Sequence, residues 1–551
     1  MKLFHKNKIE LTADQIKKRK RELLLGLLSG ILLGLSYPPV PLPFLSFFAL
    51  IPYLYVMEKR DSLLSLNRFT YFTLFIFNLI TLYWVGSWTK ESDTFLMISG
   101  AALLFFNPFF YLIVPTLYHF SRKAFGKLKA LMLLPFYWVT FEYLYSITDA
   151  RFPWLTLGNC LPYFNTFIQI ADIVGVYGIS LIILFVNIFI YLSIKNLKQN
   201  RKVDNRFAMA AVLLFFFVLV YGTIRINSFT LSEKKIKVGL IQPNLNPWNK
   251  WKDGNLDEQL TQYLSLSDKA VAQNAKLIVW PESALPVYLL SGNYDREVSR
   301  INEFVSLHNI FLMTGMPDIN FYFNRKDAPV DAKETKSGTL YTSYNSILYF
   351  SPETDAVQKY GKIKLVPFGE HVPFVEEFPF LGDFIKWEVG ISSWNVGKNQ
   401  TVFNFNKNGI SSVRAGGVIC IESIYPEFVA GFVQRGADLI VVVTNDSWYG
   451  YSSGPFQHKE ISVLRAVENR KSVVRTANGG VSCIIDPMGR TVASTKLFTK
   501  DILVNDAVIQ EGMTFYSAYP FTIPYLASLI SIVTILFFYF KKISNRISKK
   551  S

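Results

Sequence analysis

The sequence has few cysteines and few charged side chains for its length. Three cysteines in 551 residues cannot form a disulfide scaffold. Charged residues make up 18% of the chain, against roughly 25% in ordinary globular proteins. Hydrophobic residues make up 50% and aromatic residues 16%, which excludes intrinsic disorder and argues against a wholly water-soluble protein. A G-x-S-x-G motif, a P-loop and a dinucleotide fingerprint are missing, and the five histidines lack metal-ligand spacing. We therefore expect no cofactor and no metal.

The net charge of +16 is concentrated beside apolar runs. Five polar segments hold a surplus of 19 positive charges, so the rest of the chain carries a net charge of −3. This distribution follows the positive-inside rule of membrane proteins and predicts no nucleic-acid partner. The segments are 1–22, 58–68, 121–129, 195–206 and the tail from Lys541.

Apolar runs long enough to suggest membrane helices occur along the first 226 residues and once near the C-terminus. A helix needs about 20 apolar residues to cross a bilayer. The basic segments alternate with connections that are poor in Lys and Arg, which places both termini in the cytoplasm and the long segment 230–515 on the opposite face. The pattern predicts a multi-pass protein of a bacterial inner membrane with a periplasmic domain. The eight candidate runs are 23–40, 43–57, 69–88, 95–118, 129–147, 164–194, 207–226 and 520–540.

Two of these runs are less regular than the others. The run 43–57 is short and flanked by proline, and the run 164–194 contains Asp172, so we expect it to begin outside the bilayer. The first run follows a basic segment as a signal peptide would, but it lacks a cleavage site and is interpreted as a retained span.

Short β-rich runs alternate with polar helical stretches between residues 235 and 510. Helical spacing is clearest in 257–274 and 457–471, and 320–340 is a polar surface loop by composition. Strands interleaved with helices predict an α/β layered domain with buried sheets. We therefore expect a membrane domain at 1–230 with seven spans, a catalytic domain at 231–515, and an eighth span with a basic tail at 516–551.

Three chemically reactive side chains stand at the ends of predicted strands. Glu282 follows LIVWP, Lys362 stands in the segment Tyr360-Gly-Lys-Ile-Lys364, and Cys420 ends GGVIC. A thiolate attacks carbonyl carbon, a carboxylate can take up the thiol proton, and an ammonium with a backbone N–H can stabilise an oxyanion. The three are separated by 80 and 58 residues, so only the fold can bring them together.

The segments around these residues resemble the nitrilase superfamily of carbon–nitrogen hydrolases. Its apolipoprotein N-acyltransferase branch resembles this chain further in Tyr360-x-Lys-x-x-Leu-Val-Pro-Phe-Gly-Glu370, Thr444-Asn-Asp-Ser-Trp-Tyr-Gly450 and Arg465-Ala-x-Glu-x-Arg470. The several spans, the large domain and the last span also match. The resemblance implies a polytopic α-helical membrane domain of about eight transmembrane helices plus an extramembrane α/β nitrilase-like αββα sandwich.

The resemblance also implies roles for individual residues. Glu282 matches the general base, Lys362 the oxyanion-stabilising lysine and Cys420 the nucleophile, with Glu370 and Glu422 as supporting carboxylates. The aromatic residue that usually follows the nucleophile is replaced by isoleucine, and the histidine before Leu-Val-Pro by Lys364. Residues expected to contact substrate are Trp251, Trp448, Tyr449, Ile421 and Trp154.

The implied reaction is a two-step acyl transfer through a thioester on the cysteine. The donor is a phospholipid, with phosphatidylethanolamine expected, and the acceptor is the α-amine of the diacylglyceryl-cysteine of apolipoproteins. The chain is expected to act as a monomer. Two alternatives stay open: a membrane-anchored nitrilase-type amidase, which would release the acyl group to water, and a catalytically inactive lipoprotein-binding relative.

For several residues a purely structural role stays open beside these functional ones. Cys483 and Trp448 are compatible with core positions, and a Cys160–Cys483 disulfide is one possibility on the oxidising face. Glu142 lies within the run 129–147, where a carboxylate needs a partner, and Arg151 is the candidate. His458 is interpreted as structural rather than as a substrate contact.

Overall fold

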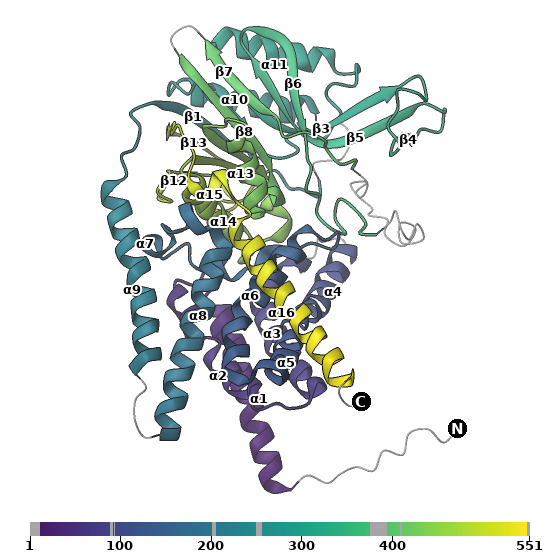
Figure 1. Cartoon of the computed structure of the whole chain (residues 1–551). Coiled ribbons are helices and arrows are strands. Elements are labelled where there is room, and N and C mark those ends of the chain that lie inside the picture. Colours follow the sequence, from purple (N-terminus) through teal and green to yellow (C-terminus); the bar gives the residue numbers. More distant parts are fainter. Residues whose placement is uncertain are drawn as a thin grey trace.

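The computed structural model describes residues 12–88, 92, 94–200, 205–249, 256–374, 394–407 and 410–547. Helices form one end of the molecule and two β-sheets form the other (Figure 1). The start of α1 (Ala13–Leu35) and the end of α16 (Thr522–Ile547) lie at the helical end, away from the sheets (Figure 1). Both ends of the described chain are therefore on the same side of the helical part.

The helical part consists of long apolar helices joined by short helical turns. Its elements, beside α1 and α16, are η1 (Pro43–Phe47), α2 (Ile51–Met57), α3 (Leu63–Leu82), η2 (Tyr83–Gly86), α4 (Thr94–Phe110), α5 (Ile113–Phe125), α6 (Lys127–Ile147), η3 (Pro153–Leu155), η4 (Leu157–Cys160), α7 (Asn165–Ile168), α8 (Ala171–Asn200) and α9 (Asn205–Ser228).

Within the described residues, six helical segments are long and apolar enough to cross a membrane. They correspond to six of the eight runs predicted from the sequence, so the chain is a multi-pass membrane protein with six candidate spans. The segments are Leu63–Gly86, Thr94–Phe125, Lys127–Ile147, Ala171–Leu197, Arg206–Ser228 and Thr522–Lys541.

Two of the eight predicted runs are not among these six segments, and each has a local reason. In α1 the run Lys17–Glu22 is charged, and the apolar part Leu23–Leu35 measures only about 20 Å as a helix, less than a hydrocarbon core of about 30 Å. The run 43–57 is divided into η1 and α2, and each begins with a proline in its first turn.

The helix of the sixth run is interrupted near its start, close to Asp172. Gly175 has a φ of +62°, which interrupts α8 shortly after its start. A Cβ at Gly175 would lie 2.3 Å from the Tyr516 ring, so this position requires glycine for both space and conformation. The segment from Ala171 to Gly175 is therefore separated from the long apolar helix that follows.

The first sheet has seven strands in the order β13-β1-β2-β3-β5-β4, with β6 paired to β5. β1, β2 and β3 are parallel, whereas β13 and β5 run antiparallel to their neighbours. Its strands are β1 (Lys235–Gln242), β2 (Leu277–Trp280), β3 (Phe311–Tyr322), β4 (Lys333–Glu334), β5 (Leu340–Ser351), β6 (Thr354–Gly361) and β13 (Asp501–Val508). The predicted loop 320–340 thus contains the end of β3 and the short strand β4.

The second sheet has six strands in the order β12-β11-β10-β9-β8-β7. β8, β9 and β10 are parallel, and every residue of β9 and β10 is buried, which explains the uninterrupted apolar sequence LIVVV in β9. The strands are β7 (Val402–Lys407), β8 (Ile410–Ile419), β9 (Leu439–Thr444), β10 (Ser472–Ala477), β11 (Cys483–Ile485) and β12 (Thr491–Ser494).

The two sheets pack face to face between two layers of helices. Apolar residues of both sheets share one buried cluster, which includes Met313, Ile347, Phe403 and Val441. Helices α10 (Leu256–Val271) and α11 (Asp295–His308) cover the outer face of the first sheet through a second cluster. Helices α13 (Pro426–Gln434) and α14 (Gly454–Asn469) cover the second sheet. The predicted αββα sandwich is confirmed, and α14 confirms the helical spacing of 457–471.

Buried ion pairs join the sandwich to the helical part. Arg470, just after α14, donates to Asp172 of α8 at 2.7 Å, and Asp172 also accepts from Arg225 of α9 at 2.7 Å. Glu468 accepts a hydrogen bond from the Val176 amide at 2.9 Å, next to the interruption in α8. The motif Arg465–Arg470 therefore lies at the junction between the two parts, with the α15 turn (Phe515–Ala518) beside it.

Candidate active site

A cavity of about 170 Å³ brings the three reactive side chains together. Glu282 follows β2, Lys362 follows β6, and Cys420 begins the 3-10 helix η5 (Cys420–Ile424) directly after β8. All three line the cavity, and so does Glu370. The convergence that the sequence could not establish is thus produced by two strand ends of the first sheet and one of the second.

Lys362 is the buried cation of the site, with 1% of its surface exposed. Its Nζ donates to Glu370 Oε1 at 2.8 Å and to Glu282 Oε1 at 3.3 Å. Burial alone would lower the pKa of this ammonium, but the carboxylates of Glu370 and Glu282 raise it above its ordinary value. Lys362 therefore remains a fixed positive charge.

Glu282 is held by donors on both carboxylate oxygens. Asn345 Nδ2 donates to Oε1 at 2.8 Å, and the Asn445 amide donates to Oε2 at 3.0 Å. Gly315 of β3 permits this placement, because a Cβ there would lie 2.5 Å from the Glu282 Cα. The carboxylate is therefore oriented by groups from β3, β5 and the end of β9.

Cys420 stands in a strained turn between β8 and η5. Its φ of +50° lies in the left-handed region, which costs on the order of 1–3 kcal/mol for a residue with a side chain. Burial and the nearby Glu282 carboxylate raise the pKa of its thiol above the ordinary value, while Lys362 lowers it. The resting thiol therefore carries its proton and needs a base to become a nucleophile.

Glu370 links the lysine to the loop that follows it. Beside the Lys362 bond, its Oε1 accepts from Asn345 Nδ2 at 2.9 Å and its Oε2 accepts from the Val366 amide at 2.9 Å. Asn345 therefore bridges Glu282 and Glu370. The amide of Asn345 was not predicted from the sequence, because a single Asn inside a strand carries no signal of this kind.

Glu422 is fully buried behind the lysine and the cysteine. It accepts from Tyr360 Oη at 2.7 Å and from the amides of Ile363 at 2.7 Å and Ile419 at 2.9 Å. Burial raises its pKa to about 7, while hydrogen bonds to its carboxylate oppose that shift. Glu422 thus ties the backbone beside Lys362 to the backbone beside Cys420 without lining the cavity.

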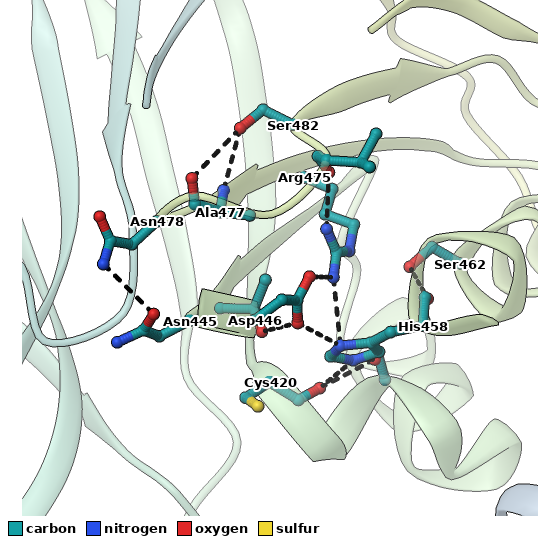
Figure 2. A network of polar contacts seen from close by, with 12 residues as sticks. Cys420, Asn445, Asp446, His458, Ser462, Arg475, Ala477, Asn478 and Ser482 are labelled. Atoms are coloured by element: carbon teal, nitrogen blue, oxygen red, sulfur yellow. Dashed lines mark hydrogen bonds and ion pairs between the residues drawn. The ribbon is translucent and has the colours of Figure 1, made fainter. Parts of the chain in front are cut away.

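A second polar network lies behind Cys420 (Figure 2). His458 of α14 approaches Asp446 Oδ1 through Nδ1 at 2.9 Å, and Arg475 donates to Asp446 Oδ2 at 2.6 Å. Burial would raise the pKa of Asp446, but Arg475 and His458 lower it well below its ordinary range. The His458 side chain was expected to be structural, and it contacts the backbone of Cys420 rather than the thiol.

The opposite wall of the cavity comes from the helical part. Leu96, Ser99 and Leu103 lie along one face of α4, and Val85 of η2 and Phe152 lie beside them. Gly100 allows α4 to approach η2, because a Cβ there would lie 2.4 Å from Gly86 Cα. One side of the cavity is therefore charged and the other apolar.

Only some of the predicted substrate-contact residues reach the cavity. Trp448 and Tyr449, the last two residues of η6 (Asp446–Tyr449), both line it. Trp154 does not line it: its buried indole donates to Gln457 Oε1 at 2.8 Å and packs 5.4 Å from the His458 ring. The Ile421 side chain is 3% exposed and belongs to the core. Trp251 lies outside the described residues.

Two further expectations concern residues away from the cavity. Cys160 and Cys483 are both free and buried, so no disulfide joins them. Glu142 accepts from Trp138 Nε1 at 3.0 Å and from the Leu157 amide at 2.8 Å, so the partner Arg151 expected from the sequence is wrong. A carboxylate in an apolar helix requires a polar partner, and here the indole N–H of Trp138 and the backbone amide of Leu157 provide hydrogen bonds to it.

Sequence comparisons divide the chain in the same way as the fold. The family model "Carbon-nitrogen hydrolase" matches residues 237–512, and the model "Apolipoprotein N-acyltransferase N-terminal domain" matches residues 29–189. The first match covers the sandwich and all of the cavity residues that it contributes. The second lies within the helical part.

Full-length relatives match both parts together. The apolipoprotein N-acyltransferase of Chlorobaculum tepidum is 33% identical over 514 residues, which cover 91% of this chain and 93% of the relative. That of Geobacter metallireducens is 30% identical over 511 residues, covering 91% and 92%. Among solved structures, an amidase from Nesterenkonia sp. is 18% identical with a TM-score of 0.34, covering 51% of this chain and 94% of the amidase.

Proposed function

The chain belongs to the apolipoprotein N-acyltransferases of the carbon–nitrogen hydrolase (nitrilase) superfamily, and on this basis we propose that it carries a fatty acyl chain from a phospholipid to a lipoprotein through Cys420. The acceptor is the α-amine of the diacylglyceryl-cysteine at the lipoprotein N-terminus. The donor we propose is phosphatidylethanolamine. The catalytic domain faces the periplasm, both termini face the cytoplasm, and the enzyme acts as a monomer in the inner membrane.

One observation carries the phospholipid as donor. The cavity of Cys420 has a charged wall from the sandwich and an apolar wall from α4, η2 and Phe152. The outer face of α4 is exposed and aromatic, with Phe105, Phe106 and Phe109 each more than half exposed. An ester at the boundary between headgroup and acyl chain fits this arrangement, because its polar part meets the charges while its chain stays in apolar surroundings.

In the first step, Cys420 Sγ attacks the carbonyl carbon of the phospholipid ester and its proton passes to the Glu282 carboxylate. The oxyanion of the tetrahedral intermediate is stabilised by the Lys362 ammonium, whose charge is maintained by Glu370. The carbon–oxygen bond then breaks, and the lysophospholipid oxygen receives the proton from Glu282. The product is a thioester on Cys420.

In the second step, the α-amine of the lipoprotein cysteine attacks the thioester carbonyl carbon. Glu282 accepts a proton from the amine, the carbon–sulfur bond breaks, and the sulfur of Cys420 recovers a proton. The lipoprotein leaves with an amide-linked acyl chain. Water would give free fatty acid instead, so the apolar wall of the cavity favours the amine by limiting the access of water to Cys420.

The experiment that tests this proposal measures the mass of the intact enzyme after incubation with phosphatidylethanolamine alone, using wild type and Cys420→Ser. We expect wild type to gain one fatty acyl mass that hydroxylamine removes, and the variant to gain no hydroxylamine-labile thioester. Adding a diacylglyceryl-cysteine peptide should then transfer the label to the peptide. Release of free fatty acid with no labelled peptide would favour the amidase alternative, and no acylation of folded enzyme would reject the phospholipid as donor.

A further inference from the structure

The backbone carbonyl of Cys420 points into the network behind the site. Its oxygen lies 3.1 Å from His458 Nε2 and accepts from Ser423 Oγ at 2.8 Å. Figure 2 shows this oxygen on the His458 side of the residue and the sulfur on the other side. The His458 side chain therefore contacts the nucleophile residue without contacting its reactive atom.

The hydrogen bonds determine which ring nitrogen of His458 carries a proton. A carbonyl oxygen can only accept, so the 3.1 Å contact to Cys420 is favourable only when Nε2 is protonated. Ser423 Oγ lies 2.9 Å from the same nitrogen and already donates to the same carbonyl. On the other side of the ring, Nδ1 has both Asp446 and Arg475 as neighbours, at 2.9 and 3.1 Å. His458 is thus a donor to the Cys420 carbonyl.

Holding this carbonyl determines the direction of the next amide. A trans peptide is planar, and its C=O and N–H point in opposite directions. The N–H of Ile421 therefore points away from His458, toward the side of the sulfur. Ile421 is the second residue of η5, before the first amide that the helix can bond internally. This N–H is available to a group bound at Cys420.

We propose that His458 is a positioning residue that holds the Cys420–Ile421 peptide so that the Ile421 N–H serves with Lys362 as an oxyanion donor. The inference rests on the proposed function to the extent that Cys420 forms an acyl-enzyme. This peptide follows the strained φ of Cys420, and the hydrogen bonds to its carbonyl from His458 and Ser423 oppose a rotation that would turn the Ile421 N–H away.

Asp446 and Arg475 complete the arrangement from behind. The His458 ring is held by the Asp446 carboxylate, and Arg475 also donates to the Val481 carbonyl at 2.6 Å. The side chains of His458, Asp446 and Arg475 are at most 4% exposed. The network therefore extends from β10 and η6 to the backbone of the nucleophile, and the ring of His458 is its last member before Cys420.

The two ring contacts can be separated by a matched pair of variants. In His458→Gln the amide nitrogen replaces Nε2 and keeps the contact to Cys420, whereas in His458→Asn it replaces Nδ1 and keeps only the contact to Asp446. Full-length enzyme in detergent is acylated with 13C-carbonyl p-nitrophenyl octanoate under single-turnover conditions. This activated ester acylates Cys420 without a phospholipid, so the result stays separate from the test of the donor.

We expect His458→Asn to acylate about 100-fold more slowly with an unchanged half-saturating ester concentration, and His458→Gln to stay within about tenfold of wild type. The infrared carbonyl band of the 13C thioester should move to higher frequency in His458→Asn, since a hydrogen-bond donor is lost. The proposal would be overturned if the two variants acylated at equal rates. It would also be overturned if His458→Asn changed only the half-saturating ester concentration, or if its carbonyl band did not move.

Ser423→Ala keeps the test decisive if neither histidine variant folds. This variant removes the other donor to the Cys420 carbonyl and leaves His458 in place. Because the His458 contact remains, we expect Ser423→Ala to keep the acylation rate within about tenfold of wild type and the thioester band unchanged. A loss of about 100-fold with a shifted band would assign the carbonyl to Ser423 instead of His458 and overturn the proposal.

Discussion

Two buried ionic networks of this protein differ in whether a cavity reaches them. At the active site, Lys362 lies between Glu282 and Glu370, and all three line the cavity. At the domain junction, Asp172 lies between Arg470 and Arg225, away from that cavity. The charges are balanced in opposite senses, with one cation between two anions in the first case and one anion between two cations in the second.

The difference shows what each network can do. Desolvated charges are costly, so each network requires its partners to remain stable. At the junction every charge is used by the protein, and the network joins the sandwich to α8 and α9. At the site the lysine and the glutamate have an open side toward Cys420, where the charge that develops during acyl transfer can be stabilised. We call the junction network closed, because its charges pair with one another away from the cavity, and the site network open, because it faces the cavity. The closed network joins the two parts of the protein, and the open network supports the chemistry.

The largest expected effect comes from removing the cation of the open network. Lys362→Met should lower the acylation rate by about 10³-fold, because a preorganised oxyanion donor is lost. It also leaves Glu282 and Glu370 unpaired, which should destabilise the fold by about 3 kcal/mol. The measurement is single-turnover acylation with phosphatidylethanolamine, expressed per folded molecule from a thermal melt.

Lys364→Met is the matched control for this prediction. The same substitution is made two residues away, where the ammonium lies 5.4 Å from the Tyr425 ring rather than between carboxylates. Its acylation rate should stay within about threefold of wild type. Equal losses for the two variants would show that the cation of the site has no special role.

The second prediction concerns the closed network. Arg470→Met should lower the free energy of unfolding by about 3–5 kcal/mol, because it breaks a buried ion pair whose partners are nearly inaccessible. The rate per folded molecule should stay within about threefold of wild type, since the cavity is distant. Arg490→Met removes an ion pair to Asp486 whose arginine is 57% exposed, and it should cost less than about 1 kcal/mol. If Arg470→Met instead lowers the rate per folded molecule more than about threefold and leaves the free energy of unfolding unchanged, the junction network also supports catalysis and the distinction between the two networks is wrong.

The third prediction uses the raised pKa of the Cys420 thiol. A higher pKa leaves less thiolate at a given pH, so iodoacetamide should modify Cys420 at pH 8 at least about tenfold more slowly than a free cysteine. The rate should continue to rise through pH 9 without a plateau. The Cys420→Ser variant gives the background from Cys160 and Cys483, and peptide mass spectrometry identifies the modified thiol. A plateau below pH 8.5 would show an activated resting thiolate.

The smallest expected effect is at the apolar wall. Leu103→Trp should narrow the cavity and lower acylation by phosphatidylethanolamine with long chains by about tenfold, with less effect on a short-chain donor. Phe106→Trp lies on the exposed face of the same helix, at 62% exposure, and should leave both donors unaffected. If both variants discriminate chain length equally, the wall formed by α4 does not contact the acyl chain.

Local features of the sequence predicted much of the architecture. Six apolar runs became long helices, because sustained hydrophobicity and length determine membrane insertion without reference to distant residues. The alternation of buried strands and amphipathic helices predicted the sandwich for a similar reason. Where composition was mixed, as in α1 with its charged first half, the prediction of a span did not carry over to the structure.

The site shows what the tertiary structure decided. Glu282, Lys362 and Cys420 were found as motifs at predicted strand ends, but strands of two different sheets had to pack before they shared a cavity. Asn345, which bridges the two carboxylates, and His458, which contacts the Cys420 carbonyl, became meaningful only through their positions. Trp154 was assigned to the substrate from its motif but packs behind the site. Periodicity and composition are local properties of the chain, whereas a hydrogen-bond partner depends on where the fold places groups that are distant in sequence.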